Sequence, residues 1–421
     1  MAKIIVAAPH IGGDFPPMLQ IARALASRGH QITFLSGSSV RTTVERAGLA
    51  FAPVAGAADY DPEQMMAENA RQQPGPPQLN FGFIHTFINP MPGGHEALQE
   101  LLRADPDQYL ITNIVFLGAW PAHRGAPGLR PARWVAVSAV PLLLSSEDTT
   151  FFGPVPVGEG EDQKAANRAA NAQLQAALQP SDARADEVLT ELGAAPLAST
   201  FFDSMYTMAD ETAVLTVPGF DFERGDTPDS VHMVGILPSG GTADWQAPDW
   251  WAELDGSRPV VVVTQGTLAN HDLSALIEPT LRGLADLDVT VVAALGREAG
   301  ALSIPLPPNA RAAEFIPFDE LLPKADVFIT NGGFGGSQLA LAAGVPVIAA
   351  GLTEDKPAVA ARVAHHGVGL NLQTATPSPE EVAAATETVL KDTSMRDNAR
   401  KLAKEYAAHD PISEIERLLL A

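Results

Sequence analysis

The sequence contains no cysteine in 421 residues, which excludes disulfide bonds, thiolate metal sites and a cysteine nucleophile. Positive charge is scarce, because 27 Lys and Arg stand against 50 Asp and Glu, for a net charge of −23. Such a chain repels phosphate backbones and anionic lipid, so we expect no nucleic-acid partner. No apolar run approaches the roughly 18 residues of a membrane span. The apolar start is only as long as a strand and lacks the features of a secretion signal. We therefore expect a cytoplasmic protein.

The sequence also lacks the usual spacings of metal ligands and nucleotide loops. His365 and His366 are adjacent, which points them apart on a helix, and no His-x-x-x-His accompanies a carboxylate. A Walker A ending and a Gly-x-Ser-x-Gly nucleophile elbow are both missing. We expect neither a metal nor a cofactor.

Hydrophobic residues make up 46% of the chain and charged residues 18%, an ordinary globular composition. Residues 3–8 form a short apolar run with the pattern of a buried strand, and apolar residues then recur at helical spacing from Met18 to Leu25. A second strand pattern follows at 31–36. Strand, helix and strand within about 35 residues predict a βαβ unit and a parallel sheet.

The same alternation restarts in the second half, with strand patterns that include 260–264 and 327–330. We therefore predict an α/β protein with two Rossmann-like, doubly wound domains. The expected divisions are an N-terminal domain at 1–237, a linker at 238–258, a C-terminal domain at 259–400 and a final helix at 401–421 that packs back toward the N-terminal domain.

A glycine-rich loop follows the strand pattern at 327–330 and precedes a helix expected from about Ser337. The loop begins with Asn331 and contains Gly332, Gly333, Gly335 and Gly336. Backbone N–H groups in such a loop can approach an anion, and a helix N-terminus adds its dipole. The alternative is a tight turn with close strand–helix packing. A second turn, Gly266-Thr267 after the strand at 260–264, favours the anion site.

A second loop places Asp14 after two glycines, Gly12 and Gly13, and before Pro16. A carboxylate just past a strand end can act as a general base. Asp at this distance from Pro is also a common helix N-cap, and the spacing by itself favours the cap. His10 lies nearby, where a lone histidine is usually a satisfied polar residue.

Two stretches resemble a known family. Residues 315–370 (FIPFDELLPKADVFITNGGFGGSQLALAAGVPVIAAGLTEDKPAVAARVAHHGVGL) are similar to the donor-binding signature of glycosyltransferase family one, and residues 12–37 are similar to its opening segment. The family includes bacterial macrolide, glycopeptide and sterol glycosyltransferases and plant UDP-glycosyltransferases. The resemblance implies the GT-B fold, in which two Rossmann-like domains face a central cleft.

The resemblance also implies residue roles. Asp14 falls at the catalytic position, and Asn113 falls near the buried acid that orients the catalytic residue in other members. The implied donor-binding residues are Gly13, Gly266, Thr267, Phe315, Ile316, Pro317, Asn331, Gly332, Gly333, Gly335, Gly336, Ser337, Asp355 and Lys356. Phe315 to Pro317 match the segment that holds the base, and Asp355 with Lys356 matches the Asp-Gln pair that binds sugar hydroxyls. Asn331 replaces the usual histidine, and Lys356 replaces glutamine.

The resemblance implies an inverting glycosyltransferase, a UDP-sugar-dependent hexosyltransferase, and the missing metal-ligand spacings predict that it is metal-independent. The donor would be a UDP- or dTDP-sugar, with UDP-glucose favoured, and Asp14 would be the general base. The N-terminal half is rich in Phe and Met, which indicates an apolar phenolic, polyketide or sterol-like acceptor. The candidate acceptor residues are Phe81, Phe83, Phe87 and Phe152, with core packing as the alternative for each.

Two other functions remain open. The departures at Asp14, Asn113 and Asn331 are compatible with a non-catalytic nucleotide-sugar binder or an auxiliary partner of another glycosyltransferase. A nucleotide-sugar epimerase or hydrolase on the same architecture would need clustered carboxylates, for which only Asp14, Glu354 and Asp355 are candidates. The expected assembly is a monomer or a homodimer.

Overall fold

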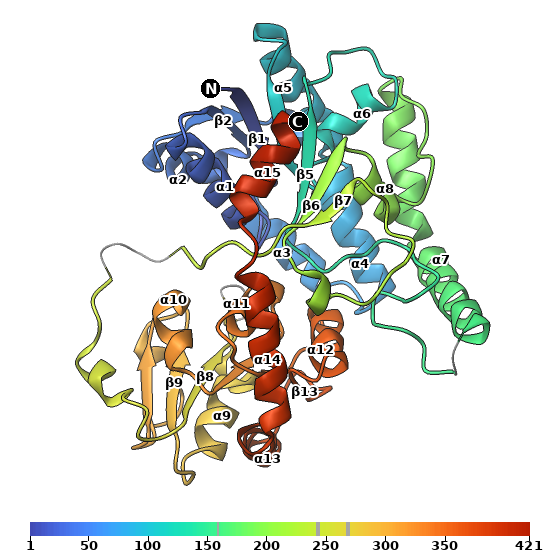
Figure 1. Cartoon of the computed structure of the whole chain (residues 1–421). Helices are drawn as coiled ribbons and strands as arrows, with labels where there is room; N and C mark the ends of the chain where they lie inside the picture. Colours follow the sequence, from blue (N-terminus) through green and yellow to red (C-terminus); the bar gives the residue numbers. More distant parts are fainter. Residues whose placement is uncertain (158–159, 241–244, 267–269) are drawn as a thin grey trace. The chain divides into compact units, whose positions relative to one another are not determined.

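A computed structural model describes residues 1–157, 160–240, 245–266 and 270–421. The chain forms two compact units, drawn in Figure 1. The first unit comprises Met1–Leu215, Glu223–Val234 and Pro411–Ala421. The second unit comprises Thr216–Phe222 and Gly235–Asp410. Each unit is therefore built from stretches that are distant in the sequence.

The first unit contains a seven-stranded sheet in the order β3-β2-β1-β4-β5-β6-β7, with every pairing parallel. Its strands are β1 (Lys3–Ala7), β2 (Gln31–Ser36), β3 (Ala50–Pro53), β4 (Tyr109–Asn113), β5 (Trp134–Ser138), β6 (Glu211–Val214) and β7 (Val231–Met233). The central strands β1 and β4 are almost wholly buried, as their continuous apolar runs predict.

Helices cover this sheet. They are α1 (Phe15–Ser27), α2 (Arg41–Arg46), α3 (Pro62–Ala70), α4 (Pro76–Gly82), α5 (Met91–Ala104), α6 (Trp120–His123), α7 (Glu161–Glu191), α8 (Phe201–Thr207) and α15 (Pro411–Leu420). A π-helical turn, Phe83–Ile88, joins α4 to α5. Helix α1 buries Met18, Ile21, Ala22 and Leu25, the face expected from their spacing.

The second unit contains a six-stranded parallel sheet in the order β10-β9-β8-β11-β12-β13. Its strands are β8 (Val260–Thr264), β9 (Thr290–Ala294), β10 (Ala310–Ala313), β11 (Val327–Thr330), β12 (Val347–Ala349) and β13 (Gly369–Asn371). Its helices are α9 (Ile277–Gly283), α10 (Phe318–Leu321), α11 (Phe334–Ala342), α12 (Lys356–His365), α13 (Pro379–Lys391) and α14 (Thr393–Tyr406). Both units thus have the doubly wound architecture predicted from the sequence.

The segment 401–421, expected to end the chain in a helix, is shared by two helices. Residues 401–406 complete α14, which contacts α11 and α13 in the second unit, and Pro411 starts α15. In the first unit α15 packs against α1, where Glu416 bonds Arg28 (2.5 Å) and His30 (2.8 Å). Proline at the first position of α15 separates the two helices.

The expected linker is also only partly a linker. Trp245, Trp250 and Trp251 pack against the hydrophobic core of the second unit, so the contact pattern assigns the described residues of 238–258 to that unit. No helix in the described part of the chain combines the length and hydropathy that crossing a membrane requires.

Candidate functional site

In the first unit, the strand order changes direction between β1 and β4, and this is where doubly wound sheets bind ligands beyond their carboxyl ends. Asp14 follows β1, and Asn113 is the last residue of β4. The buried Asn113 amide donates from Nδ2 to Asp14 Oδ1 at 3.1 Å. Asn113 Oδ1 accepts from the Val115 backbone N–H at 3.0 Å, which fixes the orientation of the amide. The structure therefore brings the two candidate catalytic residues together.

Asp14 occupies the N-cap position of α1 but does not act as a cap. Its backbone is already helical (φ −79°, ψ −34°), and its side chain makes no capping hydrogen bond. Asp61, by contrast, caps α3 by accepting from the N–H groups of Glu63 and Gln64. The geometry therefore favours a role for the Asp14 carboxylate other than capping. The exposed Gly13 precedes it in a position where a Cβ would meet nothing within 4 Å.

His10 does not offer a free base beside Asp14. Its Nε2 lies 2.8 Å from the carbonyl oxygen of Tyr60. A carbonyl only accepts, so Nε2 carries the proton and donates it. His10 is 5% exposed, and a Cβ built on Gly37 would lie 2.1 Å from its Nδ1. His10 is thus a satisfied, tightly packed residue.

A hollow in the first unit lies at the same edge of the sheet. Its cavity measures about 30 Å³, and the space between atoms reaches about 340 Å³ when the open solvent at its mouth is included. Its lining comes from the ends of three strands and from the π-helical turn and α5: Ala8, Pro9, His10, Val54, Ala58, Tyr60, Thr86, Phe87, Pro90, Met91, Gly94, Val115, Phe116, Leu117 and Gly118. We call it the acceptor-side pocket. It is apolar apart from three side chains, those of His10, Tyr60 and Thr86.

The four candidate acceptor phenylalanines do not share one place. Phe87 lines the acceptor-side pocket and also packs against the hydrophobic core. Phe83 packs against Phe201 and Phe202 at the edge of the hydrophobic core, which matches the core-packing alternative. Phe81 contacts the ring of His85, and Phe152 is 53% exposed. The periodicity of the segment does not separate these positions, because core and pocket both require apolar side chains.

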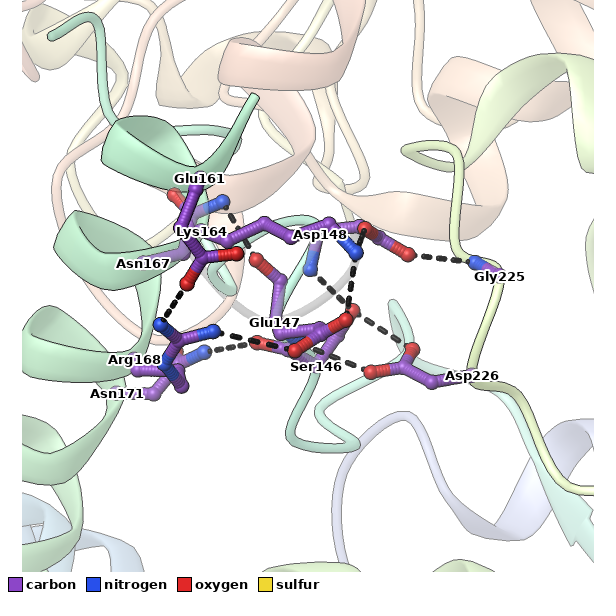
Figure 2. A network of polar contacts seen from close by, with 10 residues as sticks. All are labelled: Ser146, Glu147, Asp148, Glu161, Lys164, Asn167, Arg168, Asn171, Gly225 and Asp226. Atoms are coloured by element: carbon purple, nitrogen blue, oxygen red, sulfur yellow. Dashed lines mark hydrogen bonds and ion pairs between the residues drawn. The ribbon is translucent and has the colours of Figure 1, made fainter. Parts of the chain in front are cut away.

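The loop after β5 is held by the polar network shown in Figure 2. Glu147 pairs with Lys164 (2.5 Å) and Arg168 (3.2 Å), both on α7. Asp226 accepts from the Ser146 hydroxyl (2.8 Å) and from the Glu147 backbone N–H (2.9 Å). The loop that leads to Phe152 is therefore anchored to two other segments of the first unit.

The second unit has its own change of strand direction, between β8 and β11. Asn331, the first residue after β11, donates from Nδ2 to the carbonyl of Gln265 after β8, at 2.7 Å. Gly266 follows with φ +71°. The side chain of Asn331 thus joins the two loops that were expected to bind an anion. Thr267, the other residue of the predicted turn, lies outside the described residues.

The glycine-rich segment starts a helix earlier than predicted. Helix α11 begins at Phe334 with Gly333 as N-cap, so Gly335, Gly336 and Ser337 belong to its first turn. Glycine lowers helix propensity, which hides this turn in the sequence. The N–H of Ser337 bonds Gly333 at 3.0 Å, whereas the N–H groups before it have no intrahelical partner. Those earlier amides point out of the helix start.

Packing does not explain these glycines. A Cβ at Gly335 would meet nothing within 4 Å, and at Gly333 it would meet only Asn331 Oδ1 at 3.9 Å. Neither has a positive φ, unlike Gly332 (φ +87°). The open space before the helix start therefore fits an anion better than close strand–helix packing. The Oγ of Ser337 is buried, with no hydrogen-bond partner in the described structure.

The predicted sugar-binding pair stands at the start of α12. Asp355 is its N-cap residue without a capping bond, and burial raises the pKa of the Asp355 carboxyl to about 6. Lys356 lowers that pKa and Glu354 raises it. Lys356 itself forms an ion pair with Glu354, whose φ is +57°.

The predicted base-binding segment follows β10. Phe315 is 55% exposed, whereas Ile316 is buried and packs in the core. Pro317 is the N-cap residue of α10, and its carbonyl accepts from Glu320 and Leu321. Phe315 is therefore the member of the three that is available for stacking. Within the described residues, no three His, Asp or Glu side chains gather in a way that could hold a metal ion.

Comparison with known proteins identifies the family. A model of the C-terminal domain of proteins like erythromycin biosynthesis protein CIII matches residues 278–421. The chain is 36% identical over 428 residues to UDP-glycosyltransferase 2 of Phaeomoniella chlamydospora, covering 98% of this chain and 94% of that protein. The chain belongs to the UDP-glycosyltransferase family. The family resemblance and the enzyme class predicted from the sequence are thereby confirmed.

Two further comparisons also cover nearly all of this chain. It is 36% identical over 427 residues to 4'-demethylrebeccamycin synthase of Lentzea aerocolonigenes, covering 99% of each chain. The crystal structure of the calicheamicin glycosyltransferase CalG4 matches with a TM-score of 0.72 at 21% identity, covering 100% of this chain and 98% of that one. The predicted GT-B fold is confirmed.

Sequence patterns did not single out Tyr60. It lies between β3 and α3 in a segment without a recognisable motif, and only the fold brings it to the acceptor-side pocket. A lone tyrosine in a polar loop gives no periodic signal that would have identified it.

Proposed function

We propose that this glycosyltransferase is inverting and metal-independent, and that it transfers a hexose from a UDP-sugar to a hydroxyl of an apolar acceptor. The observation that carries the proposal is the Asp14 carboxylate, which makes no capping bond and is held by Asn113 at 3.1 Å. A positioned carboxylate beyond a central strand suits a general base.

Asp14 would accept the proton of the acceptor hydroxyl while that oxygen attacks the anomeric carbon. The bond from the anomeric carbon to the diphosphate breaks on the opposite face, which inverts the configuration. The nucleoside diphosphate leaves as an anion, so the leaving group needs no proton. Its charge would be met by the amides at the start of α11 and by the helix dipole, without a bound cation.

We favour UDP-glucose as the sugar donor. One relative, 32% identical over 429 residues, is named UDP-glucosyltransferase B1, from Starmerella bombicola. A dTDP-sugar is the competing donor, because a more distant structure of the same fold, SsfS6 of Streptomyces sp. SF2575, was solved with thymidine diphosphate. In the second unit, Phe315 would stack on the base, and Asp355 with Lys356 would contact the sugar.

The acceptor would be phenolic, polyketide or sterol-like. The mainly apolar lining of the acceptor-side pocket supports this class, and Phe87 is the predicted acceptor residue that lies there. The name of the relative 4'-demethylrebeccamycin synthase points to a natural-product acceptor for that protein. We place the activity in the cytoplasm, where nucleotide sugars would be available.

The test combines UDP-glucose or dTDP-glucose with a panel of phenols and aliphatic alcohols, in the presence and absence of EDTA. Formation of a β-glucoside from the α-linked donor, detected by NMR and unaffected by EDTA, supports the proposal. An α-glucoside contradicts inversion, and loss of turnover that magnesium restores contradicts metal independence. Donor binding without turnover would indicate the non-catalytic binder, and an isomerised sugar would indicate the epimerase.

A further inference from the structure

Tyr60 is a polar residue of the acceptor-side pocket that the proposed reaction does not use. It lies in the loop after β3, and residues that follow β1 and β4 line the same pocket, among them His10 and Val115. Val115 is also the residue whose backbone N–H orients Asn113 toward Asp14. The tyrosine therefore belongs to the edge of the sheet that carries the candidate base.

The hydroxyl of Tyr60 is buried and has no hydrogen-bond partner among the described residues. Native proteins pair almost all buried polar groups, so such an atom needs an explanation. Here the hydroxyl belongs to a side chain that lines a pocket, and a ligand oxygen in that pocket could supply the missing acceptor.

The phenol ring is held in place by its neighbours. The rings of Tyr60 and His10 have centroids 4.4 Å apart, and His10 Nε2 donates to the Tyr60 carbonyl at 2.8 Å. Gly37 completes the arrangement, because a Cβ there would lie 2.1 Å from His10 Nδ1. Glycine at 37 thus admits the imidazole that supports the tyrosine. A ring fixed in this way presents its hydroxyl at small entropic cost on binding.

Electrostatics keep the hydroxyl protonated. Burial raises the pKa of the Tyr60 phenol well above its usual range, and the negative charge of Asp14 acts in the same direction. Tyr60 is therefore a hydrogen-bond donor and not a second base.

We propose that Tyr60 determines acceptor specificity by donating its hydroxyl to a second oxygen of the acceptor, carried next to the hydroxyl that is glycosylated. The preferred acceptors would be catechols, ortho-alkoxyphenols and vicinally oxygenated polyketides. This inference rests on the proposed function and names the acceptor class for the same site. In a wall whose other side chains are apolar except those of His10 and Thr86, a fixed donor discriminates strongly between ligands with and without the matching oxygen.

The test measures equilibrium binding of three ligands of similar shape, 2-methoxyphenol, catechol and 2-methylphenol, by calorimetry in the presence of UDP. Wild-type protein should bind the two oxygenated ligands roughly tenfold more tightly than 2-methylphenol. Tyr60→Phe should abolish this preference by weakening the oxygenated ligands, with little change for 2-methylphenol. Tyr109→Phe, the same change at the first residue of β4, is the matched control and should keep the preference.

Stability provides a second readout. Because the Tyr60 hydroxyl has no protein partner, Tyr60→Phe should not lower the melting temperature of the free protein. A lower melting temperature, or equal weakening of all three ligands, would show a structural role and overturn the inference. Binding does not require turnover, so the ligand selectivity can be measured even if no glycoside forms. Absence of the glycoside would contradict the proposed function, whereas absence of the selectivity would contradict the role of Tyr60.

Discussion

Asn113 donates its side-chain amide to a carboxylate oxygen of Asp14, joining two residues 99 positions apart in the sequence. The contact exists because β1 and β4 are adjacent parallel strands whose carboxyl ends meet at one edge of the sheet. Asn113 is fully buried and its other amide atom is bound to Val115, so it has little freedom to turn away. The Asn113 amide is neutral and donates here, so it positions the Asp14 carboxylate without taking up the proton that Asp14 would accept from the acceptor hydroxyl.

Asp14→Asn should abolish most of the activity without affecting folding. The change removes the proton acceptor, and the native carboxylate makes no capping bond whose loss would destabilise α1. We expect kcat for an aliphatic alcohol to fall by about 10²–10⁴, with a smaller loss for acidic phenols. Melting temperature and UDP affinity should stay unchanged.

Asp61→Asn is the matched control, because Asp61 is a true cap and Asn caps about equally well. It should leave both kcat and stability near the wild-type values. If Asp14→Asn glycosylated an aliphatic alcohol at the wild-type rate, Asp14 would not be the base. His10 would not replace it in its present geometry, because its Nε2 carries the proton and its other ring nitrogen, Nδ1, is buried against Gly37.

Asn113→Asp should change the pH dependence of the reaction. The substitution puts a second carboxyl group about where the Nδ2 atom now lies, 3.1 Å from Asp14. Two carboxylates this close in a buried place cannot both ionise easily, so the pair retains a proton to higher pH. We expect the acidic limb of the kcat–pH profile to move up by about one unit or more. An unchanged limb would show that Asp14 does not act in the reaction as an ionised base.

Gly335→Val should weaken donor binding selectively. The added side chain would stand at the start of α11, where its Cβ meets no protein atom within 4 Å but would obstruct a diphosphate. We expect UDP affinity to fall at least tenfold, which is about 1.4 kcal/mol, with little change in melting temperature. Gly300→Val, at another glycine with open space around it, is the control and should leave UDP binding intact. Unfolding of Gly335→Val would instead support a packing role.

The sequence predicted the elements of the sheet centres well. The strands at 31–36, 260–264 and 327–330 match the structure residue for residue, because each is a short segment rich in β-branched and other apolar residues. The start of α11 was placed about three residues too late, since its first turn is rich in glycine. The local sequence pattern does not locate the start of a helix where residues of low helix propensity form its first turn.

The residues of the candidate site were likewise predictable from the sequence only in part. Glycines and Asp14 at strand ends are visible in the sequence, because parallel sheets place binding loops there. Phe83 and Phe87 are four residues apart and both pack against the core, so periodicity cannot tell that Phe87 also lines a pocket. The spacing of Asp14 and Pro16 favours an N-cap, whereas the Asp14 side chain makes no capping hydrogen bond in the structure.

His366 should make the protein less stable in acid. Burial, and secondarily the neighbouring His365, lower the pKa of His366 to about 4, and its Nε2 bonds the Asp221 carbonyl at 3.0 Å. The unfolded chain, with a pKa near 6.5, binds the proton more readily between these values. The stabilising contribution is therefore complete above pH 6.5 and is lost as the pH falls toward 4.

His366→Gln removes this titration, so its free energy of unfolding should fall less than that of wild type between pH 7.5 and 5. The two slopes should differ by at most about 1.4 kcal/mol per pH unit. Urea unfolding at several pH values gives the comparison. His85→Gln, at an exposed histidine of the first unit, serves as the control. Parallel slopes for His366→Gln and wild type would contradict the assignment.

Donor binding should depend on the ionisation of Asp355. Its pKa of about 6 means that the carboxylate, which can accept hydrogen bonds from sugar hydroxyls, forms as the pH rises through that value. KM for UDP-glucose should therefore decrease between pH 5 and 7.5 in wild type. Asp355→Asn should give a higher KM whose pH dependence lacks this step.

The two residues beside Asp355 should shift the midpoint of this KM change in opposite directions. Because Glu354 raises the Asp355 pKa and Lys356 lowers it, Glu354→Gln should move the midpoint down and Lys356→Gln should move it up. Steady-state kinetics at constant ionic strength would measure the three midpoints. If the KM of the wild type did not change with pH, or if both variants moved the midpoint in the same direction, Asp355 would not be a sugar-binding residue.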